Sequence, residues 1–227
     1  MKGRRLDFAD HRRELGENRF VYPVVSRRAQ GLSIGVNLNP DKVCNFDCPY
    51  CQVDRRVPAR VREVDLEILE AEIDAMLGLA AGEIWRHPPF DTVDPALRRV
   101  ADLAFSGDGE PTSSAALLPA LEIVARLRDK HGLSEISPVL ITNASLFHRA
   151  EVAYALDRLY TLGGEVWGKL DAGTQPFFEQ VCGTRLSLDR IVTNLTRAAS
   201  HPLVIQAMFH GWDGAAPPEV EIEAWGR

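Results

Sequence analysis

Short runs rich in aliphatic and β-branched residues alternate along this chain with longer segments in which apolar residues recur at helical spacing. The short runs are expected to be strands, and they cover residues 32–38, 102–106, 138–142, 165–170 and 203–209. Strands that alternate with helices are typical of βα units, whose strands pair in parallel. The pattern therefore predicts an α/β fold built around a sheet of parallel strands.

The longer segments predict the helices between these strands. Asp65 precedes the first helix and is a suitable N-cap. Residues 82–95 contain glycine and three prolines, so they are expected to form a loop instead. The apolar faces are expected to comprise Leu66, Leu69, Ile73, Met76 and Leu77, then Leu117, Leu121, Val124 and Leu127, then Val152, Leu156 and Leu159, and later Leu188, Ile191 and Leu195.

Polar or glycine-rich sequences follow directly after four of the predicted strands. They span residues 39–51, 107–112, 143–145 and 171–174. In parallel α/β sheets and barrels, ligands bind at the edge formed by the carboxyl ends of the strands. We therefore expect the functional site at this edge.

The length of the chain fits one domain. With 227 residues, of which 45% are apolar, the chain can bury one sizeable core. We expect residues 31–227 to form the core domain and residues 1–30 to be a basic segment that packs on it. The sequence has no run long and apolar enough to cross a membrane, and its first residues lack the apolar stretch of a signal peptide. A cytoplasmic protein without a membrane partner is therefore expected.

The charge balance bears on the class of partner. A formal net charge of −6 argues against a protein that binds nucleic acid mainly through a broad positive field. The N-terminal segment is nevertheless basic, and a cluster of this kind is more typical of a solvated face than of a nucleic-acid site. The arginines concerned are Arg4, Arg5, Arg12, Arg13, Arg27 and Arg28.

Three of the four cysteines lie within eight residues, where Cys44, Cys48 and Cys51 form the pattern CxxxCxxC. This spacing suits shared metal ligation in a reducing compartment better than disulfides. Iron–sulfur clusters are held by thiolates, and three thiolates leave one iron of a [4Fe–4S] cluster open to a non-protein ligand. Because Pro49 disfavours helix at Cys48, we expect a loop that wraps a cluster.

A structural zinc site is the alternative, and it requires four nitrogen or sulfur ligands. The chain has no second CxxC pair, and the histidines nearest to the three cysteines are His11 and His87. The fourth cysteine, Cys182, is isolated in the sequence and is expected to be a small core residue rather than a cluster ligand. The sequence therefore favours an iron–sulfur cluster over zinc.

The CxxxCxxC spacing, with the aromatic Tyr50 directly before the last cysteine, resembles the signature of the radical S-adenosylmethionine superfamily. The resemblance implies that the three cysteines hold a [4Fe–4S] cluster whose open iron binds the amino and carboxylate groups of S-adenosylmethionine. It implies an oxidoreductase-like enzyme that cleaves this cofactor reductively to methionine and a 5′-deoxyadenosyl radical, which abstracts hydrogen from a substrate. It also implies an electron donor such as flavodoxin or ferredoxin.

A second motif follows the second predicted strand. Ser106, Gly107 and Glu110 resemble the family's glycine-glycine-glutamate motif, in which backbone and carboxylate groups receive the amino group of the cofactor's methionine. One extra residue separates the glycine from the glutamate here, so Asp108 and Glu110 are both candidates for that contact. A plain glycine turn in which Pro111 opens a helix is the alternative.

Further candidate cofactor ligands follow the next strands. Asn143 and Ser145 occupy the place where the family has polar contacts to the ribose or carboxylate, although either residue also suits a helix N-cap. Lys169 and Asp171 are expected either to contact the cofactor or to form an ordinary ion pair. Gln206 alternates with apolar neighbours and is a candidate to face the barrel interior. No catalytic residue is assigned from the sequence.

One branch of the superfamily resembles this chain more specifically. It comprises iron–sulfur oxidoreductases grouped with the wyosine-base synthases that modify transfer RNA. The likeness leaves the substrate open among a small molecule, a peptide and transfer RNA, because enzymes that share a fold and cofactor act on unrelated substrates. The segments that carry it are residues 37–43, 106–112, 142–145 and 169–174.

The resemblance implies a (β/α)6-type barrel. After the fifth predicted strand, residues 211–227 are expected to supply only a loop and the start of a helix. We therefore expect a partial radical S-adenosylmethionine barrel of parallel strands, open or truncated after the fifth strand. A working radical enzyme with a wide lateral opening fits this expectation, and so does a cluster-carrying binding or electron-transfer protein without turnover.

Overall fold

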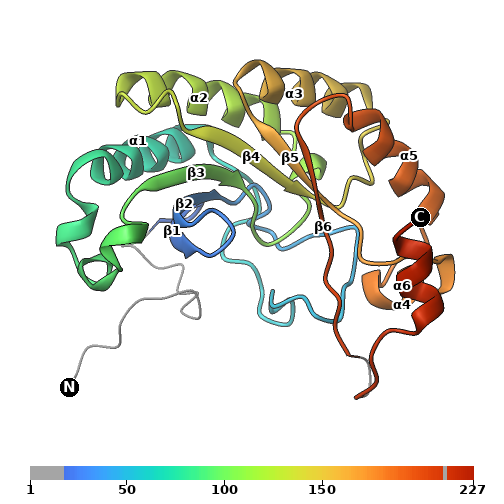
Figure 1. The fold of residues 1–227 in the computed structure, drawn as a ribbon. Helices are drawn as coiled ribbons and strands as arrows, with labels where there is room; N and C mark the ends of the chain where they lie inside the picture. The colour runs from blue at the N-terminus through green and yellow to red at the C-terminus, as the bar shows by residue number, and fades with distance from the viewer. Residues whose placement is uncertain (1–17, 212–213) are drawn as a thin grey trace.

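The computed structural model describes residues 18–211 and 214–227, and within these residues six strands form one sheet in chain order (Figure 1). β2 to β6 are parallel to one another, whereas β1 pairs antiparallel with β2. β1 and β6 are therefore the two edges of an open sheet. The strands are β1 (Val21–Ser26), β2 (Gly31–Val36), β3 (Val100–Phe105), β4 (Ser137–Thr142), β5 (Glu165–Lys169) and β6 (Leu203–Gln206).

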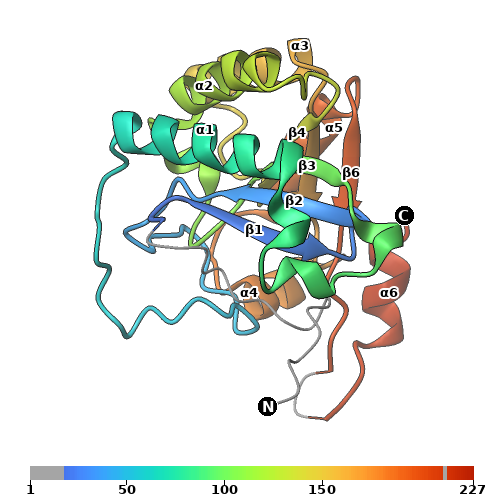
Figure 2. The ribbon, with the colours of Figure 1, turned by 90° about the vertical axis from the view of Figure 1, so that its left-hand side faces the viewer.

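Helices connect the parallel strands and cover one side of the sheet. Figure 1 shows α1, α2, α3 and α5 along its convex side. In Figure 2 the strands lie between α1 and α2 on one side and α4 with the long β2–α1 connection on the other. No helix in the described residues is long and apolar enough to cross a membrane. The helices are α1 (Leu66–Gly82), α2 (Leu117–Lys130), α3 (Ala150–Thr161), α4 (Gln175–Cys182), α5 (Leu188–Ala198) and α6 (Glu219–Trp225).

The apolar periodicity predicts these helices well, and the predicted α/β class is confirmed. Asp65 is the N-cap of α1, since its side chain accepts hydrogen bonds from two backbone N–H groups of the first turn. Leu66 differs from the expectation because, at the first helical position, it lies outside the core and is 39% exposed. The other apolar positions expected on the four helices are buried: Leu69, Ile73, Met76, Leu77, Leu117, Leu121, Val124, Leu127, Val152, Leu156, Leu159, Leu188, Ile191 and Leu195.

Two predicted segments differ in extent from the structure. The loop expected at residues 82–95 contains short 3₁₀ turns that bury Ile84 and Phe90, because the prolines prevent an α-helix without removing the apolar side chains. The strand expected at residues 203–209 ends at Gln206, and the side chain of Phe209 beyond it is 46% exposed. This edge of the sheet is shorter than the apolar run suggests.

The sequence pattern predicts no strand at β1, within the segment expected to be basic and to pack on the core. Pro23 argues against a strand inside a sheet because it lacks an N–H group, but an edge strand tolerates it. Arg27 is exposed, as expected of a solvated face, whereas the Arg28 side chain is only 17% exposed. The expectations for residues 1–17 lie outside the described residues.

One carboxylate attaches the start of β1 to α1. Phe20 and Val21 at this point are each 1% exposed, so their backbone groups need partners within the protein. Glu72 of α1 accepts three backbone hydrogen bonds, of 2.7, 2.9 and 3.1 Å, from Arg19, Phe20 and Val21. The helix therefore supplies the acceptor that the edge strand needs at its beginning.

Glu72→Ala is expected to lower the free energy of unfolding by about 1.5–3 kcal/mol, because three N–H groups lose a charged acceptor. Urea denaturation followed by circular dichroism measures this loss. Glu70→Ala is the matched control, since Glu70 lies on the same helix but pairs with Arg126 at an exposed position. The control should lose less than about 1 kcal/mol. Equal losses in the two variants would contradict the anchoring role of Glu72.

Candidate functional site

A cavity of about 190 Å³ opens at the carboxyl ends of β3 and β4, and we call it the cysteine cavity. Cys44, Cys48 and Cys51 all line it from residues 44–51, which we call the cysteine loop. The expected non-helical conformation of this loop is confirmed. The other lining residues are Phe46, Tyr50, Val53, Arg55, Ser106, Gly107, Asp108, Gly109, Glu110, Ile141, Thr142, Asn143 and Lys169.

The three thiols line the cavity without closing on one point. Within residues 18–211 and 214–227, no three His, Cys, Asp or Glu side chains are placed to hold one metal ion together. Burial raises the pKa of the Cys44 thiol. A hydrogen bond donated by the Cys182 side chain lowers the pKa of the Cys48 thiol to about 6, although burial opposes this change. The lowered pKa favours the thiolate of Cys48, which is the form that binds metal.

The end of α4 packs directly against the cysteine loop. The carbonyl oxygen of Cys182 accepts hydrogen bonds from the Asp47 N–H at 3.1 Å and from the Cys48 thiol at 3.7 Å. Gly183 follows with a φ of 59°, and a Cβ atom at this position would overlap the Asp47 backbone. Cys182 is 2% exposed and belongs to the core, as expected. Its carbonyl group additionally holds the cysteine loop in place.

Tyr50 connects the cysteine loop to the end of β5. Its hydroxyl donates a hydrogen bond to Asp171 and accepts one from Lys169 Nζ at 2.8 Å. Lys169 and Asp171 also form an ion pair of 3.3 Å, which agrees with the ion-pair alternative for these residues. Asp171 lies behind the cavity, is 2% exposed, and accepts a hydrogen bond from the Met208 N–H. These contacts fix the cysteine loop to the rims of β5 and β6.

Glu110 joins the loops that follow β3 and β4. Its carboxylate is 2% exposed and accepts four hydrogen bonds within the protein. The donors are the Thr112 N–H at 3.1 Å, Thr112 Oγ1 at 2.6 Å, Thr142 Oγ1 at 2.6 Å and the Asn143 N–H at 2.7 Å. Burial raises the pKa of this carboxyl, and the four hydrogen bonds oppose the rise. One side chain thereby fixes two loops of the site.

Asp108 is held by the segment that leads into the cysteine loop. Its carboxylate accepts a hydrogen bond from Asn37 Nδ2 at 2.9 Å, and its N–H donates to Asn37 Oδ1 at 3.2 Å. The next residue, Gly109, lies so close to Val43 and Asn39 that a Cβ atom would overlap both. The glycine therefore permits the close approach of these two segments.

Asn143 and Ser145 connect the end of β4 to the cysteine loop, and the N-cap alternative is wrong because α3 begins without a side-chain cap. Asn143 lines the cavity and donates through Nδ2 to Asn45 Oδ1 at 2.8 Å. Ser145 does not line the cavity, and its Oγ accepts from Asn45 Nδ2 at 2.7 Å. Between them, Ala144 has a φ of 57°, uncommon for a residue with a side chain, and Asn194 holds its carbonyl group.

Arg55 lines the cysteine cavity although the sequence pattern does not single it out. Its Nη1 donates to Cys51 Sγ at 3.4 Å, and its Nε donates to the Lys42 carbonyl group at 3.1 Å. The only signal in the sequence is its position four residues after Cys51.

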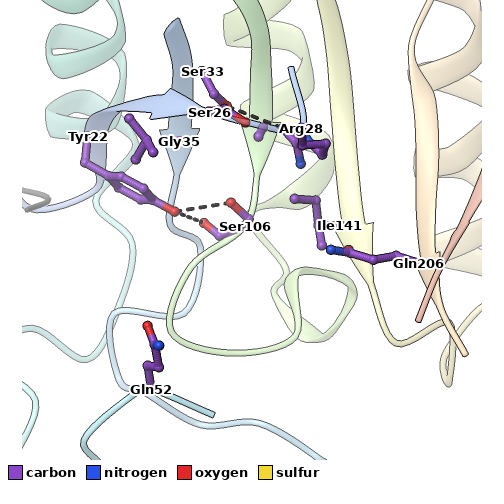
Figure 3. A pocket seen from close by; sticks show the side chains of 11 residues that line it. Tyr22, Ser26, Arg28, Ser33, Gly35, Gln52, Ser106, Ile141 and Gln206 are labelled. Atoms are coloured by element: carbon purple, nitrogen blue, oxygen red, sulfur yellow. Dashed lines mark hydrogen bonds between the residues drawn. The ribbon is translucent and has the colours of Figure 1, made fainter. Parts of the chain in front are cut away.

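Gln206 lies in a second cavity, of about 280 Å³, rather than in the cysteine cavity (Figure 3). We call it the sheet cavity, since residues of β1 to β4 form most of its lining. Ser106 and Ile141 line both cavities, so the two adjoin. The other lining residues are Tyr22, Val24, Ser26, Arg28, Ser33, Gly35, Gln52 and Ala104.

Comparison with known proteins gives short matches in sequence. No protein-family model matches the chain. A UPF0026 protein from Methanocaldococcus jannaschii is 32% identical over 133 residues, which are 57% of this chain and 34% of that protein. A UPF0026 protein from Helicobacter pylori strain J99 is 29% identical over 139 residues, which are 59% of this chain and 37% of that protein. The match thus spans about a third of the length of these relatives.

The fold is similar to that of TYW1, a radical S-adenosylmethionine wyosine synthase. The structure of TYW1 with a lysine–pyruvate adduct bound matches with a TM-score of 0.52 and 13% identity, over 88% of this chain and 68% of that chain. At this identity the likeness concerns the fold alone. It confirms the partial barrel with an open sheet that the sequence predicts.

Glu110→Gln is expected to lower the free energy of unfolding by about 2–3 kcal/mol, because its amide NH₂ group would face buried N–H donors that need an acceptor. Urea denaturation measures the change. Glu135→Gln, at an exposed loop position, is the control and should change stability by less than about 0.5 kcal/mol. A loss at Glu110 no larger than that of the control would show that the two loops are held by other contacts.

Proposed function

We propose that this chain is a radical S-adenosylmethionine enzyme in which Cys44, Cys48 and Cys51 hold a [4Fe–4S] cluster. The observation that carries the proposal is that the CxxxCxxC loop and the loop of residues 106–110 line one cavity. The similarity in fold to TYW1 supports it. When bound, the cluster and S-adenosylmethionine supply a reductive cleavage to methionine and a 5′-deoxyadenosyl radical, which removes a hydrogen atom from the substrate.

The donor set fits a cluster better than it fits a single ion. Thiolates that bind different irons of a cluster need not converge on one point. Three thiol ligands also leave one iron for the amino and carboxylate groups of the cofactor. The hydrogen bond from the Cys182 side chain and the ammonium of Lys169 both lower the pKa of Cys48, which favours the thiolate form that a cluster requires.

Asp108 is the acidic residue to which we assign the amino group of the cofactor. Four donors within the protein already meet the carboxylate of Glu110, three at Oε1 and one at Oε2. Turning Glu110 toward a ligand would leave those donors buried without an acceptor. Asp108 lines the same cavity and is oriented by Asn37. We therefore assign ligand contact to Asp108 and the positioning of the loops to Glu110.

The remaining candidate residues divide in the same way. Ser106, Gly107, Asn143 and Lys169 line the cavity, so we assign to them contacts with the ribose and carboxylate of a bound cofactor. Tyr50 lines it as well and is oriented by Lys169. Ser145 and Asp171 lie behind the cavity instead. Each bonds to a residue of the cysteine loop, so we assign them a positioning role.

The electron donor and the substrate follow from the same proposal. A cytoplasmic flavodoxin or ferredoxin is the donor we expect. The similarity to TYW1 makes transfer RNA one candidate substrate, whereas the net charge of −6 favours a small molecule or peptide. A cluster-carrying binding or electron-transfer protein without turnover is the second candidate function. The open sheet edge at β6, where Ile205 is 40% exposed, favours it.

Anaerobic reconstitution tests the cluster. We expect the wild type to gain about four irons per chain with a broad visible absorbance, and to form 5′-deoxyadenosine from S-adenosylmethionine once reduced. Cys48→Ala should lose both while keeping its circular dichroism spectrum, because Cys48 lies on a rim loop outside the regular elements. Cys182→Ser is the control and should keep the cluster, because its hydroxyl retains the hydrogen bond to Cys48. Normal cluster content in Cys48→Ala would refute the ligand assignment, and a cluster without 5′-deoxyadenosine would favour the second candidate function.

Asp108→Asn is expected to keep the iron content of the wild type but to bind S-adenosylmethionine about tenfold to a hundredfold more weakly, because a charge-assisted hydrogen bond is lost. Equilibrium dialysis of the reconstituted protein measures this affinity. Asp54→Asn is the matched control, since Asp54 is near the cysteine loop but does not line the cysteine cavity. An unchanged affinity of Asp108→Asn for S-adenosylmethionine would show that another residue binds the amino group of the cofactor.

A further inference from the structure

The sheet cavity has one charged end and one neutral end. Figure 3 shows Arg28 and Gln52 at opposite ends, with the hydrogen-bonded pair of Tyr22 and Ser106 between them. Among the residues that line this cavity, Arg28 is the one with a charged side chain. Ser106 marks the part that adjoins the cysteine cavity. A ligand that fills the space therefore meets a guanidinium at the end remote from the cysteine loop.

Arg28 is held in place by residues of three strands. Its Nη2 donates to Asp102 at 2.7 Å, and its guanidinium carbon lies 4.7 Å from the centre of the Trp167 ring. Asp102 also accepts a hydrogen bond from Ser33, and its side chain is 8% exposed and does not line the cavity. Of the two members of this ion pair, only the Arg28 guanidinium therefore lines the cavity and can contact a ligand there.

The guanidinium retains donor groups beyond the ion pair. An arginine has five N–H donors, and the hydrogen bonds of Arg28 within the described residues, to Asp102 and Ser33, both come from Nη2. Nε is buried without a partner, and the side chain as a whole is 17% exposed. Arginine donors in a fixed plane match the oxygen atoms of an acid group such as a carboxylate.

The rest of the lining is mostly neutral and polar, which suits a ligand with hydroxyl or carbonyl groups. A volume of about 280 Å³ lies near the lower end of the range for small-molecule sites, roughly 300–1,000 Å³. The neutral polar side chains are those of Tyr22, Ser26, Ser33, Gln52, Ser106 and Gln206. The space therefore fits a small polar molecule.

We propose that the sheet cavity binds the substrate, and that this substrate is a small polar organic acid whose acid group contacts Arg28. The opposite end of the acid then lies beside Ser106 and Ile141, where the two cavities adjoin. The reaction at that end rests on the proposed function, whereas the binding of the acid does not. Arg28 is the residue that selects the charge of the substrate.

Matched pairs of ligands test the charge selection. The probes are glycerate against glycerol, lactate against 1,2-propanediol and gluconate against sorbitol, in which a carboxylate replaces a neutral carbon terminus. Saturation-transfer NMR titrations of the full chain measure each dissociation constant. At least one acid is expected to bind about tenfold or more tightly than its alcohol. The proposal is overturned if no acid binds more tightly than its neutral partner.

Two variants locate the selection. The double variant Arg28→Gln with Asp102→Asn removes both charges without leaving a buried carboxylate unpaired, and it should lose the preference for the acid. Arg27→Gln, at the neighbouring exposed position, should keep it. Circular dichroism verifies that both are folded. A third variant, Gln206→Leu, changes the same cavity without altering the ion pair, and it should weaken the binding of acid and alcohol equally. A preference that survives in the double variant overturns the role of Arg28.

The same preparations separate this inference from the proposed function. Binding is measured without a cluster, and 5′-deoxyadenosine is measured after reconstitution. Selective binding of an acid with no 5′-deoxyadenosine would sustain the sheet cavity as an acid site and reject the radical enzyme. Formation of 5′-deoxyadenosine with no preference for the acid in any ligand pair would support the radical enzyme and reject the sheet cavity as an acid site.

Discussion

The buried carboxylate of Glu110 is the interaction on which the arrangement of the site depends. A carboxylate removed from water requires hydrogen bonds within the protein, and the donors that meet Glu110 belong to the loops after both β3 and β4. The cysteine loop is bound to the same assembly through Asn45 to Asn143, and the segment that leads into it approaches Gly109 closely at Val43. Three segments without regular structure thereby acquire one defined geometry around the cysteine cavity.

Periodicity predicts the fold well because burial in an α/β sheet repeats along each element. The helix faces and five parallel strands follow from local sequence, whereas β1 does not, since Pro23 is compatible with a strand only at an edge. The position of an edge is a property of the whole sheet. The early end of β6 at Gln206 has the same cause, because a strand continues only where its neighbour continues to pair.

The candidate site was predictable at the level of loops but not of individual contacts. The carboxyl ends of parallel strands lie at one edge, so the CxxxCxxC segment and the loops after β3, β4 and β5 had to meet. Both Asp108 and Glu110 line the cavity, and the sequence could not show that Glu110 is the one whose carboxylate accepts four hydrogen bonds within the protein, because one residue separates them. Arg28 has a basic neighbour and looks solvated, yet Asp102 and Trp167, far along the chain, enclose it.

Tyr22 and Gly35 are directly opposite on β1 and β2, and the tyrosine ring occupies the space into which any side chain at position 35 would project. The Tyr22 hydroxyl also reaches Ser106 at the rim. A larger residue at position 35 therefore requires a smaller one at position 22, and that exchange removes the contact to Ser106. Among homologues these two positions should therefore covary. If selection maintains the contact to Ser106, it also limits which residues the hairpin of β1 and β2 can acquire during evolution.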